Sequence, residues 1–156
     1  MRLTMFSDYT LRTLMYLAVR PEQLVTISDI AQAYGISSNH LMKVVHQLAL
    51  SGDVTTLRGQ HGGLRLARPA AEINVGAVVR RSEADFDIVP CFGAEACCAI
   101  QPGCVLTGII DEATRAFLTV LDRYSLADLA APRTVLARLL RIEVAAGDIE
   151  IAASPV

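Results

Sequence analysis

Two helical patterns separated by a glycine turn most constrain what this chain can fold into. The first covers residues 29–34, with Ser28 as its expected capping residue, and stops at Gly35. The second begins after Ser37, carries apolar residues at helical spacing and ends at Gly52. A helix, a glycine-containing turn and a second helix form the helix-turn-helix plan, in which the first residues of the second helix meet base edges in the major groove of DNA.

A glycine-rich hairpin pattern follows the second helix. Residues 54–57 and 64–66 are short β-like runs, and the connection between them holds glycines and basic side chains. An earlier amphipathic helix, expected to begin at Ser7 or Asp8 and to end by Pro21, supplies a third helix. Three helices closed by a basic hairpin make a winged helix. We therefore predict a mainly α fold with a small β-hairpin wing, a winged helix-turn-helix.

The side chains of the second helix and of the hairpin suit contact with DNA. Asn39 offers an amide that pairs with adenine, serines read either kind of base, and Lys43 suits a phosphate. For His40 a packing role at the start of the helix competes with a DNA contact, and we expect His46 to lie between helices. Small residues at the hairpin tip let the backbone enter a narrow minor groove. The predicted DNA contacts are Ser28, Ser37, Ser38, Asn39, His40, Lys43, Arg58, Gln60, His61, Gly62, Gly63 and Arg65.

Charge is divided unevenly along the chain. Residues 1–81 carry a net charge of +4 and residues 82–156 carry −6, which gives the total of −2. This asymmetry permits a phosphate-facing first half, and a solvated charged face is the alternative explanation. We do not expect an enzyme, because the sequence offers no Ser-His-Asp arrangement, phosphate-binding glycine loop or paired acids in a suitable context.

All four cysteines of the chain lie in one short segment, residues 91–104, between two helical patterns. A disulfide is the obvious competitor, but the start of the chain lacks the pattern of a secretory signal, and disulfides persist mainly in oxidising compartments. We therefore expect a cytoplasmic protein whose thiolates hold a metal or an iron-sulfur cluster. A zinc-stapled winged-helix protein is the alternative, since four thiolates suit a tetrahedral ion.

A long amphipathic helix is predicted over residues 105–121. The apolar fraction of 53% is high for a chain with no run long enough to span a membrane, and it suggests an oligomer interface. The apolar stripe of this helix packs against its twin in a two-fold dimer, or it covers the chain's own first helix. We divide the chain into a DNA-binding domain (1–81), a cysteine-rich loop (82–104), a dimerisation helix with a short helix after it (105–130) and a C-terminal tail without an assigned role (131–156).

Four motifs, at residues 6–12, 38–45, 58–66 and 98–104, together resemble the winged-helix iron-sulfur transcriptional regulators, and within them the nitric-oxide-sensing branch. The likeness ends near Leu129. It implies a homodimeric repressor that sits on double-stranded operator DNA with an inverted repeat and takes nitric oxide as its signal. Regulators of the same family that respond to cluster supply, redox state or iron share this architecture and are the alternative.

The resemblance also implies a set of cluster ligands. Cys98 and Cys104 match through the Ile and Pro between them, and Cys91 is the remaining upstream ligand. Cys97 is one cysteine more than the family pattern has, and it is the alternative to Cys98. In one branch of the family an aspartate from the partner's first helix completes a four-iron four-sulfur cluster, and Asp8 stands in the matching context. We favour that cluster, with a two-iron two-sulfur cluster as the alternative; Asp8 also suits the positive end of its own helix.

Overall fold

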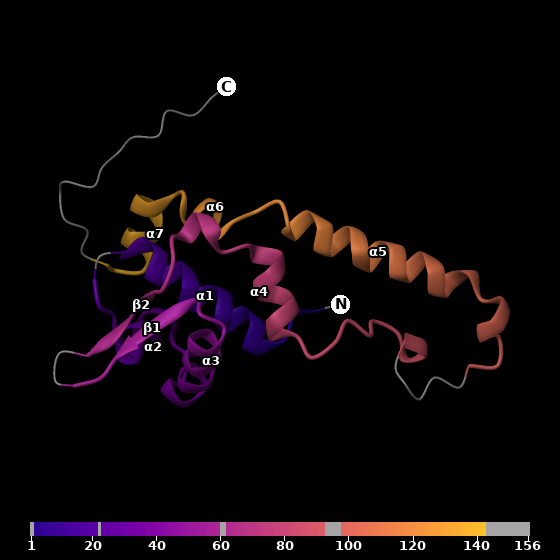
Figure 1. The fold of residues 1–156 in the computed structure, drawn as a ribbon, viewed down its shortest axis with the longest axis horizontal. Helices are drawn as coiled ribbons and strands as arrows, with labels where there is room; N and C mark the ends of the chain where they lie inside the picture. The colour runs from indigo at the N-terminus through magenta and orange to yellow at the C-terminus, as the bar shows by residue number, and fades with distance from the viewer. Residues whose placement is uncertain (1, 22, 60–61, 93–97, 143–156) are drawn as a thin grey trace, which may run out of the picture.

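Helix α1 (Met5–Val19) is the element against which most of the fold packs. The computed structural model describes residues 2–21, 23–59, 62–92 and 98–142. Figure 1 shows α1 running through the body of the molecule with the other elements around it. Its principal contacts are with α3 (Ser38–Leu50), α4 (Val75–Ser82), α6 (Leu126–Ala130), α7 (Arg133–Leu139) and strand β2 (Gly63–Leu66).

Helix α1 begins one turn earlier than the sequence indicated. Thr4 caps it, because its hydroxyl oxygen accepts a hydrogen bond from the backbone N–H of Ser7 at 3.2 Å. Ser7 is itself buried, and its hydroxyl donates to the hydroxyl of Ser82 at 2.8 Å. The prediction that Ser7 or Asp8 caps this helix was therefore wrong.

Helix α2 (Ile27–Tyr34) is capped at both ends by residues that flank it in the sequence. Thr26 and Asp29 form a capping box, in which each side chain accepts a hydrogen bond from the backbone N–H of the other residue. Ser28 lies inside the first turn, so the prediction that it caps the helix was wrong. Gly35 ends the helix with a φ of 64°, a left-handed conformation that glycine adopts without strain.

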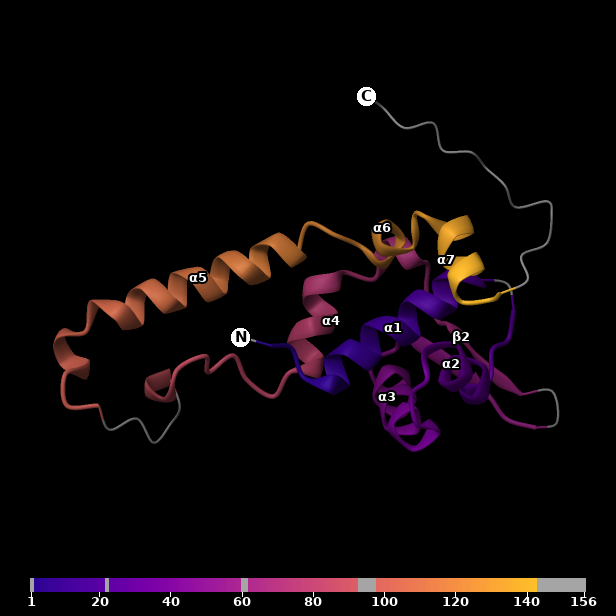
Figure 2. The ribbon, with the colours of Figure 1, turned by 180° about the vertical axis from the view of Figure 1, so that it is seen from behind.

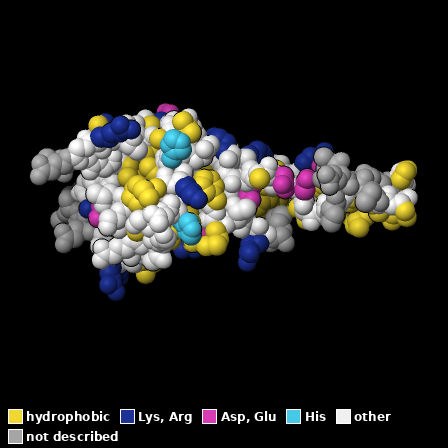
Figure 3. Space-filling view, turned by 90° about the horizontal axis from the view of Figure 1, so that it is seen from below, with side chains coloured by type: hydrophobic (Ala, Val, Ile, Leu, Met, Phe, Trp, Pro, Cys, Tyr) yellow, Lys and Arg dark blue, Asp and Glu magenta, His cyan; other side chains and the backbone are white. Residues whose placement is uncertain are grey.

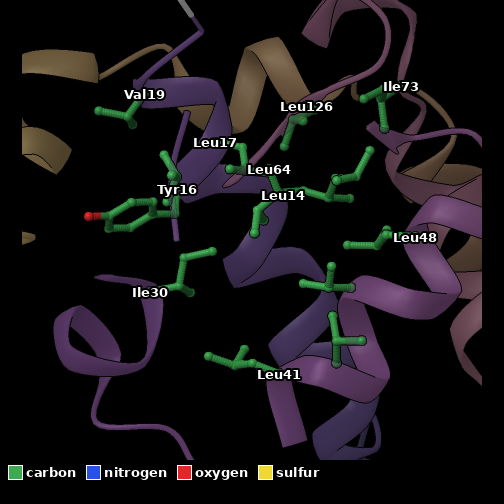
Figure 4. Close-up of a cluster of buried hydrophobic side chains, with 14 of the residues drawn as sticks. Leu14, Tyr16, Leu17, Val19, Ile30, Leu41, Leu48, Leu64, Ile73 and Leu126 are labelled. Carbon is green, nitrogen blue, oxygen red and sulfur yellow. The ribbon is translucent and has the colours of Figure 1, made fainter. Parts of the chain in front are cut away.

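Helix α3 and its neighbours enclose the core of the winged helix. Figure 4 shows side chains from α1, α2, α3, β2 and later segments pointing toward one another. The turn after α2 contributes Ile36, which is also buried. Large side chains with 0–1% exposure in this core are Leu14, Leu17, Ile30, Leu41, Ile73 and Leu126.

The wing is an antiparallel pair of strands. Strand β1 (Val54–Leu57) pairs with β2 in a register that sets Val54 opposite Leu66. Val25 bridges Leu64 and so ties the strand pair to the segment before α2. Gly62, at the predicted tip, has room only for hydrogen, because a Cβ there would collide with the carbonyl oxygen of Leu57. The hairpin that the sequence predicts is thus present, with its strands on the expected residues.

Helix α5 (Val105–Leu121) extends away from this body, as Figures 1 and 2 show from two sides. A 3₁₀ turn (Ala70–Glu72) precedes α4, and two more (Pro90–Phe92 and Gln101–Gly103) lie between α4 and α5. Arg80 of α4 holds the end of α5 through an ion pair with Asp122. The alternative in which α5 covers the chain's own first helix is not the arrangement seen.

Helices α6 and α7 return the chain to α1. The Leu126 backbone N–H donates to the carbonyl oxygen of Ile73 at 2.8 Å, and Arg133 donates through Nε to the carbonyl oxygen of Val19 at 3.0 Å. Part of the predicted C-terminal tail is therefore integrated into the fold. No helix among the described residues combines the length and apolar character needed to cross a membrane.

Candidate functional site

The outward side of α3 carries several of the predicted DNA contacts. Ser38, Asn39 and Lys43 are exposed, whereas Leu41 and Val44 on the opposite side are fully buried. Packing of the apolar side fixes how the helix is rotated about its axis. Figure 3 views the molecule from the side of α3 and shows histidine and Lys or Arg side chains lying among apolar ones. This presentation of the first turns of α3 is the one that major-groove contact requires.

Both histidines of α3 are exposed. The ring of His40 stacks on that of Tyr9 from α1, with centroids 6.1 Å apart and an interplanar angle of 27°. His46 is also exposed, so the prediction that it lies between helices was wrong. It stands seven residues after Asn39 and therefore on the same side of the helix. Sequence reasoning missed His46 as a candidate DNA contact, although its spacing from Asn39 could have indicated it.

Two serines predicted to contact DNA, one near the start of α2 and one near the start of α3, are exposed. Ser28 lies in the first turn of α2, and Ser37 is the residue that precedes α3. The Ser37 side chain makes no capping hydrogen bond to α3. Its hydroxyl is thus not committed to the helix and can serve an external partner.

The wing presents two basic side chains to solvent. Arg58 follows β1, and Arg65 lies on β2 with its side chain exposed. Gly62 and Gly63, between these residues, are half-buried. Gln60 and His61, also predicted to contact DNA, lie outside the described residues.

Asp53 joins the wing to α4, a link that sequence reasoning did not foresee. Its side chain is fully buried and accepts hydrogen bonds from Arg68 after β2, from Arg81 of α4 at 2.6 Å and from the hydroxyl of Ser51 at 2.8 Å. These donors replace the water that the carboxylate loses on burial. The partners lie 15 and 28 residues away along the chain, so only the folded structure reveals the link.

The cysteine loop lies between α4 and α5. Cys91 belongs to the 3₁₀ turn Pro90–Phe92 and is partly exposed, Cys98 is exposed, and Cys104 precedes α5 with partial exposure. All three are free thiols, and Cys97 lies outside the described residues. Across the described ranges, the structure brings together no group of three or more His, Cys, Asp or Glu side chains that could hold a metal.

Cys104 has the most distinctive environment of the described thiols. Hydrogen bonding from the side chain of Thr107, and then from the Thr107 backbone N–H, lowers the pKa of the Cys104 thiol. Donors at the start of α5 therefore favour the thiolate form, in which cysteine binds iron or zinc.

Asp8 borders an open hollow at the start of α1. Its side chain is 45% exposed and pairs with Arg12 at 2.9 Å. The hollow has a volume of about 660 Å³ and is also lined by Tyr9 and Tyr34. Asp8 is thus accessible, but its carboxylate already has a cationic partner in the single chain.

Arg12 is in turn held over an aromatic ring. Its guanidinium carbon lies 5.7 Å from the centroid of the Tyr34 ring, a cation–π arrangement. Burial raises the pKa of Tyr34 to about 12, against the opposing effect of Arg12. The phenol therefore stays neutral at neutral pH, and Arg12 bridges Asp8 and the end of α2.

Comparison with known proteins decides the family. Residues 3–132 match the model of the Rrf2 family, described as iron-dependent transcriptional regulators. The chain belongs to the Rrf2 family. It is 46% identical over 145 residues to the HTH-type transcriptional regulator NsrR of Bacillus subtilis, an alignment that covers 92% of this chain and 99% of the relative. NsrR of Halalkalibacterium halodurans is 42% identical over 145 residues, with the same coverage of each chain.

Solved structures of Rrf2-type regulators share the fold. The structure titled T. potens IscR has a TM-score of 0.68 at 25% identity, covering 85% of this chain and 88% of that one. CymR of B. subtilis, titled the global cysteine regulator, has a TM-score of 0.65 at 26% identity, covering 85% and 98%. The predicted winged helix-turn-helix is thereby confirmed.

Family membership defines the class of function. The relatives are named transcriptional regulators with a helix-turn-helix, so this Rrf2 protein is a DNA-binding transcriptional regulator. It is not an enzyme, in agreement with the prediction from its sequence. The outward side of α3 and the wing are the parts that this function uses in a winged helix.

Proposed function

We propose that this protein is a homodimeric repressor that senses nitric oxide through an iron-sulfur cluster and controls genes for nitric oxide detoxification or nitrosative stress. The observation that carries the proposal is the placement of three free thiols on the segment that joins the DNA-binding unit to α5. Relatives that are 41–46% identical and carry the name NsrR support the nitric oxide signal. The proposal includes a cytoplasmic location, because a transcriptional regulator acts on its operator DNA.

Exposed apolar side chains on α5 support dimerisation through this helix. Val105, Leu106, Ile109 and Val120 are between 43% and 75% exposed, which is costly for a helix that stays in water. A second copy packed along the same stripe removes this surface from water and gives a two-fold axis. Two α3 helices related by that axis would then address the two halves of an inverted repeat, with centres roughly 34–36 Å apart.

The thiols fit an iron-sulfur cluster by their chemistry. Cys91, Cys98 and Cys104 are soft ligands on one loop, and Cys97 is the alternative to Cys98. To bind the cluster, the loop must draw their sulfur atoms closer together than in the single chain described. Three thiolates suit a four-iron four-sulfur cluster that takes one further ligand from elsewhere, and a two-iron two-sulfur cluster is the alternative.

The partner subunit's Asp8 is the further ligand that we propose. Asp8 is exposed at the edge of the hollow beside α1, where the loop of a second copy can enter. Ligation requires the Asp8 carboxylate to share or leave its ion pair with Arg12. A carboxylate binds iron less tightly than a thiolate does, so this position is the one that an incoming small molecule reaches first. When bound, the cluster supplies iron that reacts with nitric oxide.

A change in the cysteine loop can reach DNA through α4. Arg81 of α4 binds Asp53 beside the wing, and Arg80 binds Asp122 at the end of α5. These two ion pairs hold α4 between the DNA-binding unit and α5. A loop that relaxes therefore shifts α4 and α5 together and alters the spacing of the two α3 helices.

The test is a nitric oxide titration of protein purified without air. Absorbance and binding to a labelled operator duplex are followed together, with parallel titrations of oxygen and of an iron chelator. We expect brown protein whose absorbance and DNA affinity both fall on stoichiometric addition of nitric oxide. A response to iron removal alone would favour the related regulators of iron, redox state or cluster supply. A colourless protein that contains zinc would contradict the proposal.

A further inference from the structure

Met42 is an apolar side chain in the middle of the outward side of α3. It is 51% exposed and is not among the apolar residues that pack on the core. The same helix buries Leu41 and Val44, so its core-facing side is already occupied by other residues. Nothing in the fold of the described chain therefore accounts for a large apolar residue at this position.

The neighbours of Met42 on the helix surface are polar. Asn39 precedes it by three residues and His46 follows it by four, and all three side chains are exposed. Residues three and four apart lie next to one another along one side of a helix, so these three form a continuous strip. Figure 3 shows this face with apolar atoms between polar groups. A ligand that covers the strip must offer hydrogen-bonding groups on both sides of an apolar group.

The major groove of DNA offers such a pattern at thymine. Each base pair presents hydrogen-bonding groups on its edge, and thymine adds the apolar 5-methyl group. A methionine side chain is unbranched and adapts its shape to an apolar partner. Asn39, one turn before, suits an adenine edge.

We infer that Met42 is a specificity-determining residue that reads thymine through the 5-methyl group, between the bases addressed by Asn39 and His46. The inference rests on the proposed binding of an inverted repeat and goes beyond it by naming a base and the atoms that recognise it. Burial of one methyl group corresponds to a change in affinity of about fourfold.

Leu50 provides a matched control on the same helix. It is even more exposed than Met42, at 69%, and is also apolar. It lies eight residues further along, roughly 12 Å toward the C-terminal end of α3, beyond the turns that reach base edges. Loss of the Leu50 side chain tests the effect of a smaller apolar surface without loss of a base contact.

The experiment removes the methyl group from the DNA and the side chain from the protein. The wild-type protein first selects an inverted repeat from a randomised duplex pool. Each thymidine of that repeat is then replaced, at the same position in both halves, by deoxyuridine, which lacks only the methyl group. Dissociation constants are measured for wild-type protein and for the Met42→Ala, Met42→Leu and Leu50→Ala variants, whose folding is checked by circular dichroism.

We expect one thymidine position at which deoxyuridine weakens wild-type binding by about fourfold per half-site. Met42→Ala should bind the original repeat more weakly and be indifferent to that replacement, while Met42→Leu and Leu50→Ala remain sensitive. Equal sensitivity of wild type and Met42→Ala, or no sensitive position at all, overturns the inference and leaves the proposed function intact. Failure of the wild type to select any repeat overturns both.

Discussion

The outward side of α3 and the cysteine loop differ in how far the single chain prepares them for function. Apolar packing sets the rotation of α3 and leaves its polar side chains outward. The described residues of the cysteine loop are not part of the hydrophobic core cluster, and its described thiols are free and at least partly exposed. Packing in the core thus forms the DNA-binding surface of the single chain, whereas the sensor that we propose would take its shape only with a cofactor and a second copy.

The strongest test of this difference removes a thiol. We expect Cys104→Ser to lose most of its bound iron and to fall to near non-specific DNA affinity, about a thousandfold weaker or more. Its thermal unfolding without cluster should match that of cluster-free wild type, because Cys104 is outside the core. Iron analysis, operator binding and calorimetry measure the three effects. Full iron content in the variant would remove Cys104 from the ligand set.

Removal of a buried charge from the DNA-binding unit should lower the stability of the fold, which Cys104→Ser should leave unchanged. Asp53→Ala leaves Arg68 and Arg81 without their shared partner, and we expect a loss of about 3 kcal/mol in the free energy of unfolding. Asp111→Ala is the matched control, since its pair with Arg115 is exposed, and it should cost less than about 0.5 kcal/mol. Urea unfolding of cluster-free protein compares them. Equal costs would mean that the Asp53 link does not stabilise the wing.

Asp8 tests whether the sensor extends across two subunits. For Asp8→Ala we expect a cluster held by cysteines alone, with a rate of reaction with nitric oxide changed on the order of tenfold. Stopped-flow absorbance measures the rate, and Arg12→Ala, which frees the carboxylate, serves as the comparison. Unchanged cluster type, lifetime and rate in Asp8→Ala would restrict Asp8 to its helix and its pair with Arg12.

The wing should contribute affinity without sequence preference. Arg65→Ala is expected to weaken binding to every duplex by a similar factor and to reduce the dependence of log affinity on log salt by about one. The absorbance of the cluster should not change. Fluorescence anisotropy over a range of salt concentrations provides the slope, and normal operator binding by the variant would contradict the wing assignment.

The smallest expected effect concerns the junction of α4 and α5. Hydrogen bonding from Arg80 lowers the pKa of the Asp122 carboxyl. Because the folded-state pKa lies below that of the unfolded chain, the pair stabilises the fold at neutral pH and this contribution disappears as the pH falls through the lowered value. Melting temperatures of wild type and Arg80→Ala should therefore differ slightly at pH 7 and converge in acid. A constant difference would exclude the ion pair as its cause.

Much of the fold could be predicted from the sequence because its signals are local. Helical spacing of apolar residues marked α3 and placed α5 at residues 105–121, and glycines marked the turn at Gly35 and the hairpin. The capping residues were harder to predict, because several hydroxyl and carboxylate side chains near the start of each helix are candidates for the capping position. Thr26, and not Ser28, caps α2 because only Thr26 has an acidic residue, Asp29, three positions later to complete a capping box.

Two features of the site depend on packing and could not be predicted in the same way. The Asp53 ion pairs join it to Arg68 and Arg81, which are distant in sequence, so no local pattern predicts them. His46 lies on the outward side of α3 instead of between helices, because it stands seven residues after Asn39, whereas Leu41 and Val44 occupy the buried side. The ligand set of Cys91, Cys98, Cys104 and Asp8 stays a prediction, since these residues would come together only around the proposed cluster and with a second copy.

The most direct test of the account measures iron, sulfide and operator affinity in one sample of protein purified without air, before and after the cluster is removed. We expect iron and sulfide bound to the protein as isolated, tight binding to the inverted repeat, and a large loss of affinity once the iron and sulfide are removed. Protein that is free of iron as isolated and still binds its operator tightly would contradict it.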